Sequence, residues 1–106
     1  MFKALSIVGL PSSLLSKHIT VLPTSPDGSI DTTNLPTSPA TPSLLILQAG
    51  HVNTGSFDLF KTLVPWSKAG AGECWIHVDG AFGLWAGVSG EEGVRGLVEG
   101  VGECDR

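Results

Sequence analysis

The sequence has little charge for its length. Only 15% of its 106 residues are charged, and its formal net charge is −4, whereas an average soluble domain carries roughly 25% charged residues. A domain of this size has a large surface for its volume and usually covers that surface with charge. The low charge therefore predicts that other protein covers much of this surface. The acidic balance provides no basic patch to release counterions from a phosphate backbone, so we expect no nucleic-acid partner.

Long hydrophobic runs and a cysteine framework are also missing. The longest apolar runs are far shorter than the roughly 18 residues that cross a bilayer, so we expect no transmembrane helix and no membrane partner. The apolar stretch in residues 1–15 is broken by Pro11 and has only Lys3 as a basic residue, which argues against a secretory signal. Cys74 and Cys104 form no CxxC pair. Two reduced cysteines are typical of a cytoplasmic protein, which is the localisation we expect.

A globular composition, with 42% hydrophobic residues, is present instead. The continuous apolar run at residues 44–47 predicts a strand buried on both faces, and residues 74–78 predict a second one. Between them, apolar residues recur at helical spacing over residues 57–68, with Asp58 near the start, where a carboxylate favours the helix dipole. A strand, a helix and a strand at this spacing predict a parallel α/β fold.

The segments around this unit are less regular. Residues 23–43 hold five of the seven prolines, and the turn signature Pro26-Asp27-Gly28 favours an ordered surface connection. A short strand is predicted at residues 19–22, a turn at residues 31–34 and a weak amphipathic helix at residues 91–101. No internal repeat is apparent.

Asp79 is the candidate functional residue that the pattern singles out. It is the only formally charged residue between Cys74 and Gly90, and it follows an apolar strand, at the end where open α/β sheets bind ligands. A carboxylate buried there is costly unless a cation or several donors pair with it. The alternative is an aspartate that caps the following loop through backbone N–H groups. No nucleotide-binding loop or nucleophile elbow is present.

His77 lies two residues before Asp79, so both side chains face one side of the strand while Val78 faces the other. The pair could supply two metal ligands, but His18 and His51 have no metal-ligand spacing to it. We therefore expect no metal site. The alternative is a hydrogen-bonded core histidine that orients Asp79.

Two linked motifs carry a family resemblance. Residues 47–58 read LQAGHVNTGSFD, and residues 75–86 read WIHVDGAFGLWA. Together they resemble the group II pyridoxal-phosphate-dependent amino-acid decarboxylases, which include the aromatic amino-acid and glutamate decarboxylases. The family hallmark is a loop of the type A-G-x-V-N-T-G-x-F-D, followed one helix later by H-V-D-[AG]-A. Weaker similarity extends the resemblance over nearly the whole chain.

The resemblance implies that residues 1–106 are an incomplete piece of the fold-type I large domain, a mostly parallel sheet flanked by helices. It implies pyridoxal 5′-phosphate as cofactor, a small amino-acid substrate, a carboxy-lyase reaction and a homodimer at full length. Asp79 matches the aspartate that pairs with the pyridine nitrogen, Ala81 an alanine packed against the cofactor, and His77 a histidine that supports the site. A pyridinium is the cation that a carboxylate needs, and the pair keeps the ring an electron sink.

One departure from the family concerns the lysine that forms the Schiff base. In the family it lies in a Ser/Asp-x-His-Lys context after the aspartate, whereas every lysine of this sequence precedes Asp79: Lys3, Lys17, Lys61 and Lys68. The resemblance therefore assigns no catalytic residue here, and we expect the chain to be inactive alone. The alternatives are a catalytically dead scaffold or interaction fragment, or a piece of another fold-type I enzyme such as an aminotransferase.

Overall fold

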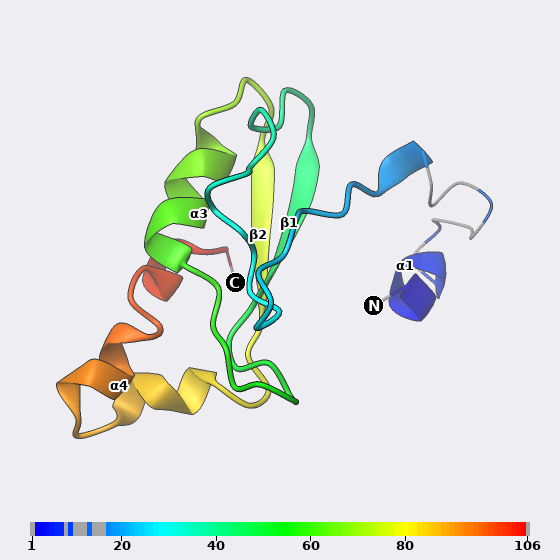
Figure 1. The fold of residues 1–106 in the computed structure, drawn as a ribbon. Coiled ribbons are helices and arrows are strands. Elements are labelled where there is room, and N and C mark those ends of the chain that lie inside the picture. The colour runs from blue at the N-terminus through cyan, green and yellow to red at the C-terminus, as the bar shows by residue number, and fades with distance from the viewer. Residues whose placement is uncertain (1, 8, 10–12, 14–16, 106) are drawn as a thin grey trace.

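The structure is a computed structural model that describes residues 2–7, 9, 13 and 17–105 (Figure 1). Its helices and strands, in chain order, are α1 (Phe2–Ile7), β1 (Ser43–Gln48), α3 (Phe60–Lys68), β2 (Cys74–Asp79), the 3-10 helix η1 (Leu84–Val88), α4 (Glu92–Gly96) and the 3-10 helix η2 (Val101–Glu103).

A two-stranded parallel sheet with one helix against it forms the centre of the molecule. β1 pairs with β2 in a register that places Ser43 opposite Cys74 and Gln48 opposite Asp79. α3 connects the two strands along the chain and lies beside them (Figure 1). The prediction of a parallel α/β fold is thereby confirmed at the level of a small α/β unit.

The hydrophobic core lies between α3 and one face of this sheet. Most of its buried side chains alternate along the strands or recur at helical spacing along α3, as the two periodicities require. The buried side chains are Leu47, Ala49, Phe60, Leu63, Val64, Ile76 and Val98. The predicted helix is confirmed, although it begins two residues after Asp58.

The opposite face of the sheet is open, so the prediction that both strands are buried on both faces was wrong. Leu44 is 51% exposed and Trp75 is 52% exposed. His77 and Asp79 are exposed as well. The reason is that a side chain is buried only where another element packs on it, and α3 covers one side of the sheet while α1 lies apart from it (Figure 1).

The predicted strand at residues 19–22 is not formed. Its Val21 is 80% exposed, and the pairing in this part of the chain is an isolated antiparallel bridge between Thr24 and Ile30. β-branched residues favour a strand only where a partner strand exists, and the described residues place none beside this segment.

The predicted turns in the proline-rich connection are confirmed. The Gly28 N–H donates to the Ser25 carbonyl at 2.9 Å, and Gly28 adopts a φ of +88°, which glycine tolerates without strain. Further along, the Asp31 carboxylate accepts from the Thr33 N–H at 2.9 Å and from the Asn34 side-chain amide at 2.7 Å. The connection is therefore ordered by its own side chains.

The predicted helix over residues 91–101 is correct only for its first half. α4 ends at Gly96, and Gly100 adopts a φ of +95°, which a continuous helix does not allow. Val98 is nevertheless buried in the core, whereas its neighbour Leu97 is 46% exposed. Over the residues described here, the structure contains no helix of the length and apolarity that a bilayer span requires.

Candidate functional site

The candidate site lies where the two strands end. Asp79 is the last residue of β2 and stands opposite Gln48, the last residue of β1. The Asp79 carbonyl accepts a hydrogen bond from the Ala49 N–H at 2.9 Å. The loops that follow both strands therefore start side by side, at the carboxyl end of the sheet where open α/β folds bind ligands.

Two glycines bring these loops into direct backbone contact. A Cβ on Gly83 would stand 2.5 Å from the Ala49 carbonyl, and a Cβ on Gly50 would stand 2.9 Å from the Gly83 Cα. Gly50 also adopts a φ of +82°, so a side chain is disfavoured there for two reasons. This role of Gly83 was not predicted, because the sequence marks Gly83 only by its position shortly after the end of β2.

His77, Asp79 and Ala81 are all exposed. The exposure along β2 alternates, with Ile76 buried and its neighbours on either side exposed, so His77 and Asp79 share the open face as predicted. The expectation of a buried Asp79 was wrong, because within residues 17–105 no helix covers that face. The open face thus presents a histidine and a carboxylate next to the small side chain of Ala81.

The Asp79 carboxylate has no hydrogen-bond partner within residues 17–105, and the His77 ring has none there either. Neither the loop-capping alternative for Asp79 nor a histidine that orients it is therefore observed. The carboxylate is accessible to a ligand from the open face.

Asp58 is a buried carboxylate whose role the sequence did not reveal. Asp58 is only 5% exposed. Its Oδ1 accepts from the Ile30 N–H at 2.8 Å, and its Oδ2 accepts from the Gln48 N–H at 2.7 Å. Charge-assisted bonds of this kind offset the cost of burying a carboxylate. Asp58 therefore joins the proline-rich connection to the end of β1, rather than acting on the dipole of α3.

The loop of the first motif is ordered by its own polar groups. His51 Nδ1 accepts from the N–H groups of Asn53 and Thr54 at 3.2 and 3.3 Å. The hydroxyls of Thr54 and Ser56 both donate to the Asp27 carbonyl, at 2.6 and 2.9 Å. The loop is thus attached to the turn at residues 25–28, and His51 serves as a local backbone cap.

Two carboxylates in the connection have lowered pKa values. The Ser29 hydroxyl and backbone N–H hold the pKa of Asp27 below its ordinary value. The Thr33 hydroxyl, followed by the Asn34 amide, does the same for the pKa of Asp31. In both cases donors stabilise the ionised form. By contrast, burial raises the pKa of the Cys104 thiol, which makes this cysteine a poor nucleophile.

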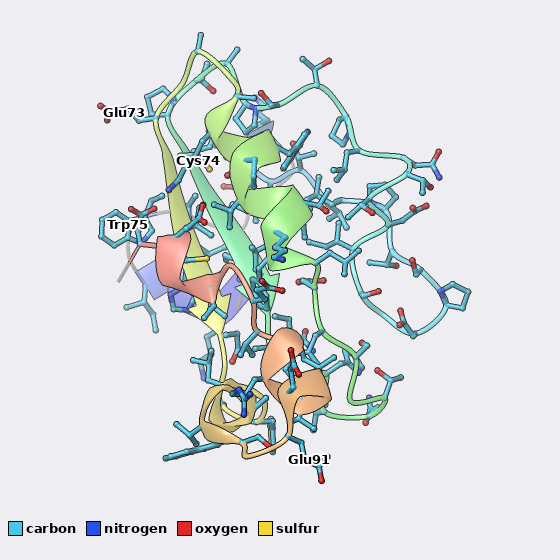
Figure 2. All side chains as sticks on the ribbon, turned by 90° about the vertical axis from the view of Figure 1, so that its left-hand side faces the viewer. Glu73, Cys74, Trp75 and Glu91 are labelled. Atoms are coloured by element: carbon cyan, nitrogen blue, oxygen red, sulfur yellow. The ribbon has the colours of Figure 1, made fainter. Side chains whose placement is uncertain are left out.

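Two cavities lie away from the carboxyl ends of the strands. One, of about 380 Å³, is lined by Pro42, Ser43, Glu73, Cys74, Trp75 and Asp105. The other, of about 390 Å³, lies between residues 55–61 and residues 96–99, next to Asp27. Figure 2 shows Trp75 of β2 and Glu73, the residue before this strand, projecting outward, with Cys74 on the side of α3. Neither cavity includes the three candidate residues, so the candidate site is an open surface.

The part of the chain that the structure describes brings no three His, Cys, Asp or Glu side chains together in a way that could hold a metal ion. Comparison of the chain with protein-family models, curated proteins and solved structures found no match. The two sequence motifs and the geometry at the strand ends are therefore the basis for a functional proposal.

Proposed function

We propose that this chain is part of a pyridoxal-phosphate-dependent amino-acid carboxy-lyase and supplies the carboxylate that pairs with the cofactor ring nitrogen. The observation that carries the proposal is the exposed Asp79 carboxylate, which has no hydrogen-bond partner within residues 17–105 and lies on the open face at the carboxyl end of β2. A protonated ring nitrogen is a cation that such a carboxylate would bind. The α/β unit would then be one portion of a fold-type I large domain.

The residues around Asp79 fit this role in part. The exposed carboxylate is accessible, His77 shares its face, and Ala81 adds little bulk beside it. When bound, the cofactor supplies an electron sink for the carbanion left after CO2 departs. Asp79 would hold the proton on the ring nitrogen, and His77 would support the site from the side. Neither of the two cavities described above includes these residues, so other protein would have to provide the remaining walls.

The lysines of α3 are poorly placed to join such a site. Lys61 pairs with Glu99 at 2.6 Å, and the Lys68 ammonium donates to the Glu103 carbonyl at 2.8 Å. Both belong to the helix that packs on the face of the sheet opposite Asp79. We therefore propose that this chain alone does not decarboxylate amino acids.

A binding experiment with pyridoxamine 5′-phosphate tests the role of Asp79. This probe carries the cofactor ring but has an amine that cannot condense with lysine, so surface lysines do not interfere. We expect equilibrium dialysis to show binding that Asp79→Asn weakens at least about tenfold, the loss of one favourable ion pair. The control Asp31→Asn, in the turn at residues 31–34, should bind like the parent chain. Equal binding by Asp79→Asn and the parent would contradict the proposal.

The open face of the sheet also favours the second candidate function, an interaction fragment without chemistry. Leu44 and Trp75 lie exposed on that face, and exposed apolar groups of this kind mark surfaces that contact other protein. Cooperative thermal unfolding of the purified chain, together with failure to bind pyridoxamine 5′-phosphate, would support this function over the enzymatic one.

A further inference from the structure

The proline-rich connection contains a short exact repeat. The pentapeptide Leu-Pro-Thr-Ser-Pro occurs at residues 22–26 and again at residues 35–39, so the expectation of no internal repeat was wrong at this length. The two copies also share a pattern of exposure: the leucine and the serine are half-buried, and the proline and threonine between them are exposed. Only the last proline differs, since Pro26 is exposed and Pro39 is half-buried.

Both copies are held through their backbone. The Pro23 carbonyl accepts from the Asp31 N–H at 2.9 Å. The Pro36 carbonyl accepts from the Trp66 indole N–H at 3.0 Å. The same position of each copy thus anchors the chain, although the donors come from unrelated parts of the molecule.

The hydroxyls of the repeat have no such role. Over the described stretch 17–105, none of its four hydroxyls has a hydrogen-bond partner: Thr24, Ser25, Thr37 and Ser38. Hydroxyls a few residues away are used, because Ser29 and Thr33 donate to Asp27 and Asp31 at 2.7 and 2.6 Å. The contacts among the described residues therefore do not explain two identical pairs of hydroxyls next to proline. Recognition of the motif by another protein would explain them.

We propose that Ser25 and Ser38 are acceptor sites for a proline-directed serine/threonine protein kinase. Proline lacks a backbone N–H, so a kinase pocket with no acceptor for the residue after the serine favours Ser-Pro. In the transfer, the serine Oγ forms a bond to the γ-phosphorus of ATP. The bond from that phosphorus to the β–γ bridging oxygen breaks, ADP leaves, and the hydroxyl proton passes to the catalytic aspartate of the kinase.

A domain that binds polyproline II segments is an alternative partner for the same motif. Such a domain needs an extended Pro-x-x-Pro stretch. Here the first copy runs into a tight turn, in which the Gly28 N–H bonds to the Ser25 carbonyl at 2.9 Å. The chain also bends at Thr37 within the second copy. The observed backbone therefore lacks the extended Pro-x-x-Pro stretch that such a domain needs.

Phosphorylation would load the connection with charge at two points. Each phosphate adds roughly 1.5 to 2 negative charges. Ser25 lies two residues from the Asp27 carboxylate, which would repel it. A Cβ on Gly70 would stand 2.7 Å from Ser38 Oγ, so the second phosphate would lie just past the carboxyl end of α3, where negative charge is unfavourable. Both sites would loosen the connection from the α/β unit.

The test is to incubate the full chain with a purified proline-directed kinase and Mg-ATP and to locate phosphate by mass spectrometry. We expect two phosphoryl groups per chain. Ser25→Ala and Ser38→Ala should each remove one, whereas the control Ser29→Ala should keep both. Pro26→Ala and Pro39→Ala should abolish transfer to the preceding serine although its hydroxyl is intact.

Thr41 provides an internal check, because it precedes Pro42 but lies outside the repeat. Phosphorylation of Thr41 to the same extent as both serines would show that a following proline alone selects the site. It would overturn the claim that the repeat marks the acceptor serines. Absence of phosphate from both serines would overturn the proposal. Capture of the unmodified chain by a polyproline-binding domain, without phosphate transfer at the serines, would replace it with docking.

Discussion

Both faces of the β1–β2 sheet carry large apolar side chains, but the faces differ in what packs on them. On the face covered by α3, Leu47 and Ile76 are fully buried. On the open face, Leu44 and Trp75 keep about half of their surface exposed. The exposed apolar side chains of the open face therefore account for part of the low charge of the sequence, because they occupy surface that charged residues usually cover. A residue's own chemistry does not decide its burial when only one side of a sheet has a helix.

The largest expected effect compares two leucines of β1. Leu47→Ala should lower the free energy of unfolding by about 2–5 kcal/mol, because it leaves a cavity in the packed core. Leu44→Ala should lower it by less than about 1 kcal/mol, since Leu44 is already half exposed. Urea denaturation of both variants measures the difference. Equal losses would show that the open face is covered in solution.

The next effect concerns the buried carboxylate that ties the connection to β1. Asp58→Ala removes the acceptor of the Ile30 and Gln48 N–H groups, and it should lower the free energy of unfolding by about 2–4 kcal/mol. The exposed turn variant Asp31→Ala should have a much smaller effect. A similar loss of unfolding free energy in both variants would mean that the buried position of Asp58 does not add to the stability of the fold.

A glycine pair sharpens the comparison at the strand ends. Gly83→Ala would place a Cβ against the backbone of Ala49, and the forced shift should cost about 1–3 kcal/mol. Gly93→Ala, in α4, meets nothing within 4 Å. It should stabilise the chain by up to about 1 kcal/mol through helix propensity. Thermal unfolding of the two variants checks the signs, and a stabilising Gly83→Ala would refute the close contact of the loops.

The smallest effect is a pH dependence of the exposed turns. The folded pKa values of Asp27 and Asp31 lie below the ordinary aspartate value, so their stabilisation of the turns is present above about pH 4. It should be lost as the pH falls through the lowered values. NMR titration of the Ser29 and Thr33 amides should report this change, while the amide of the buried Leu63, which donates to the Leu59 carbonyl, stays unaffected. Amide shifts that do not move at acidic pH would contradict the prediction.

The sequence predicted most of the α/β unit and missed the contacts that shape its functional end. The strands, α3 and the turn at residues 25–28 follow from local periodicity and turn chemistry, and all are confirmed. The role of Asp58 was missed because its partners, Ile30 and Gln48, lie 28 and 10 residues away along the chain. The strand at residues 19–22 was wrong because strand formation depends on a partner that local pattern does not report.

The sequence by itself determined that His77 and Asp79 share one face of β2, because side chains alternate along any strand. It also determined the family resemblance on which the proposed function rests. Only the tertiary structure decided that this face is the open one and that Asp79 is exposed on it. Burial is a property of packing between distant segments, and α3 packs on one face of the sheet and leaves the other free.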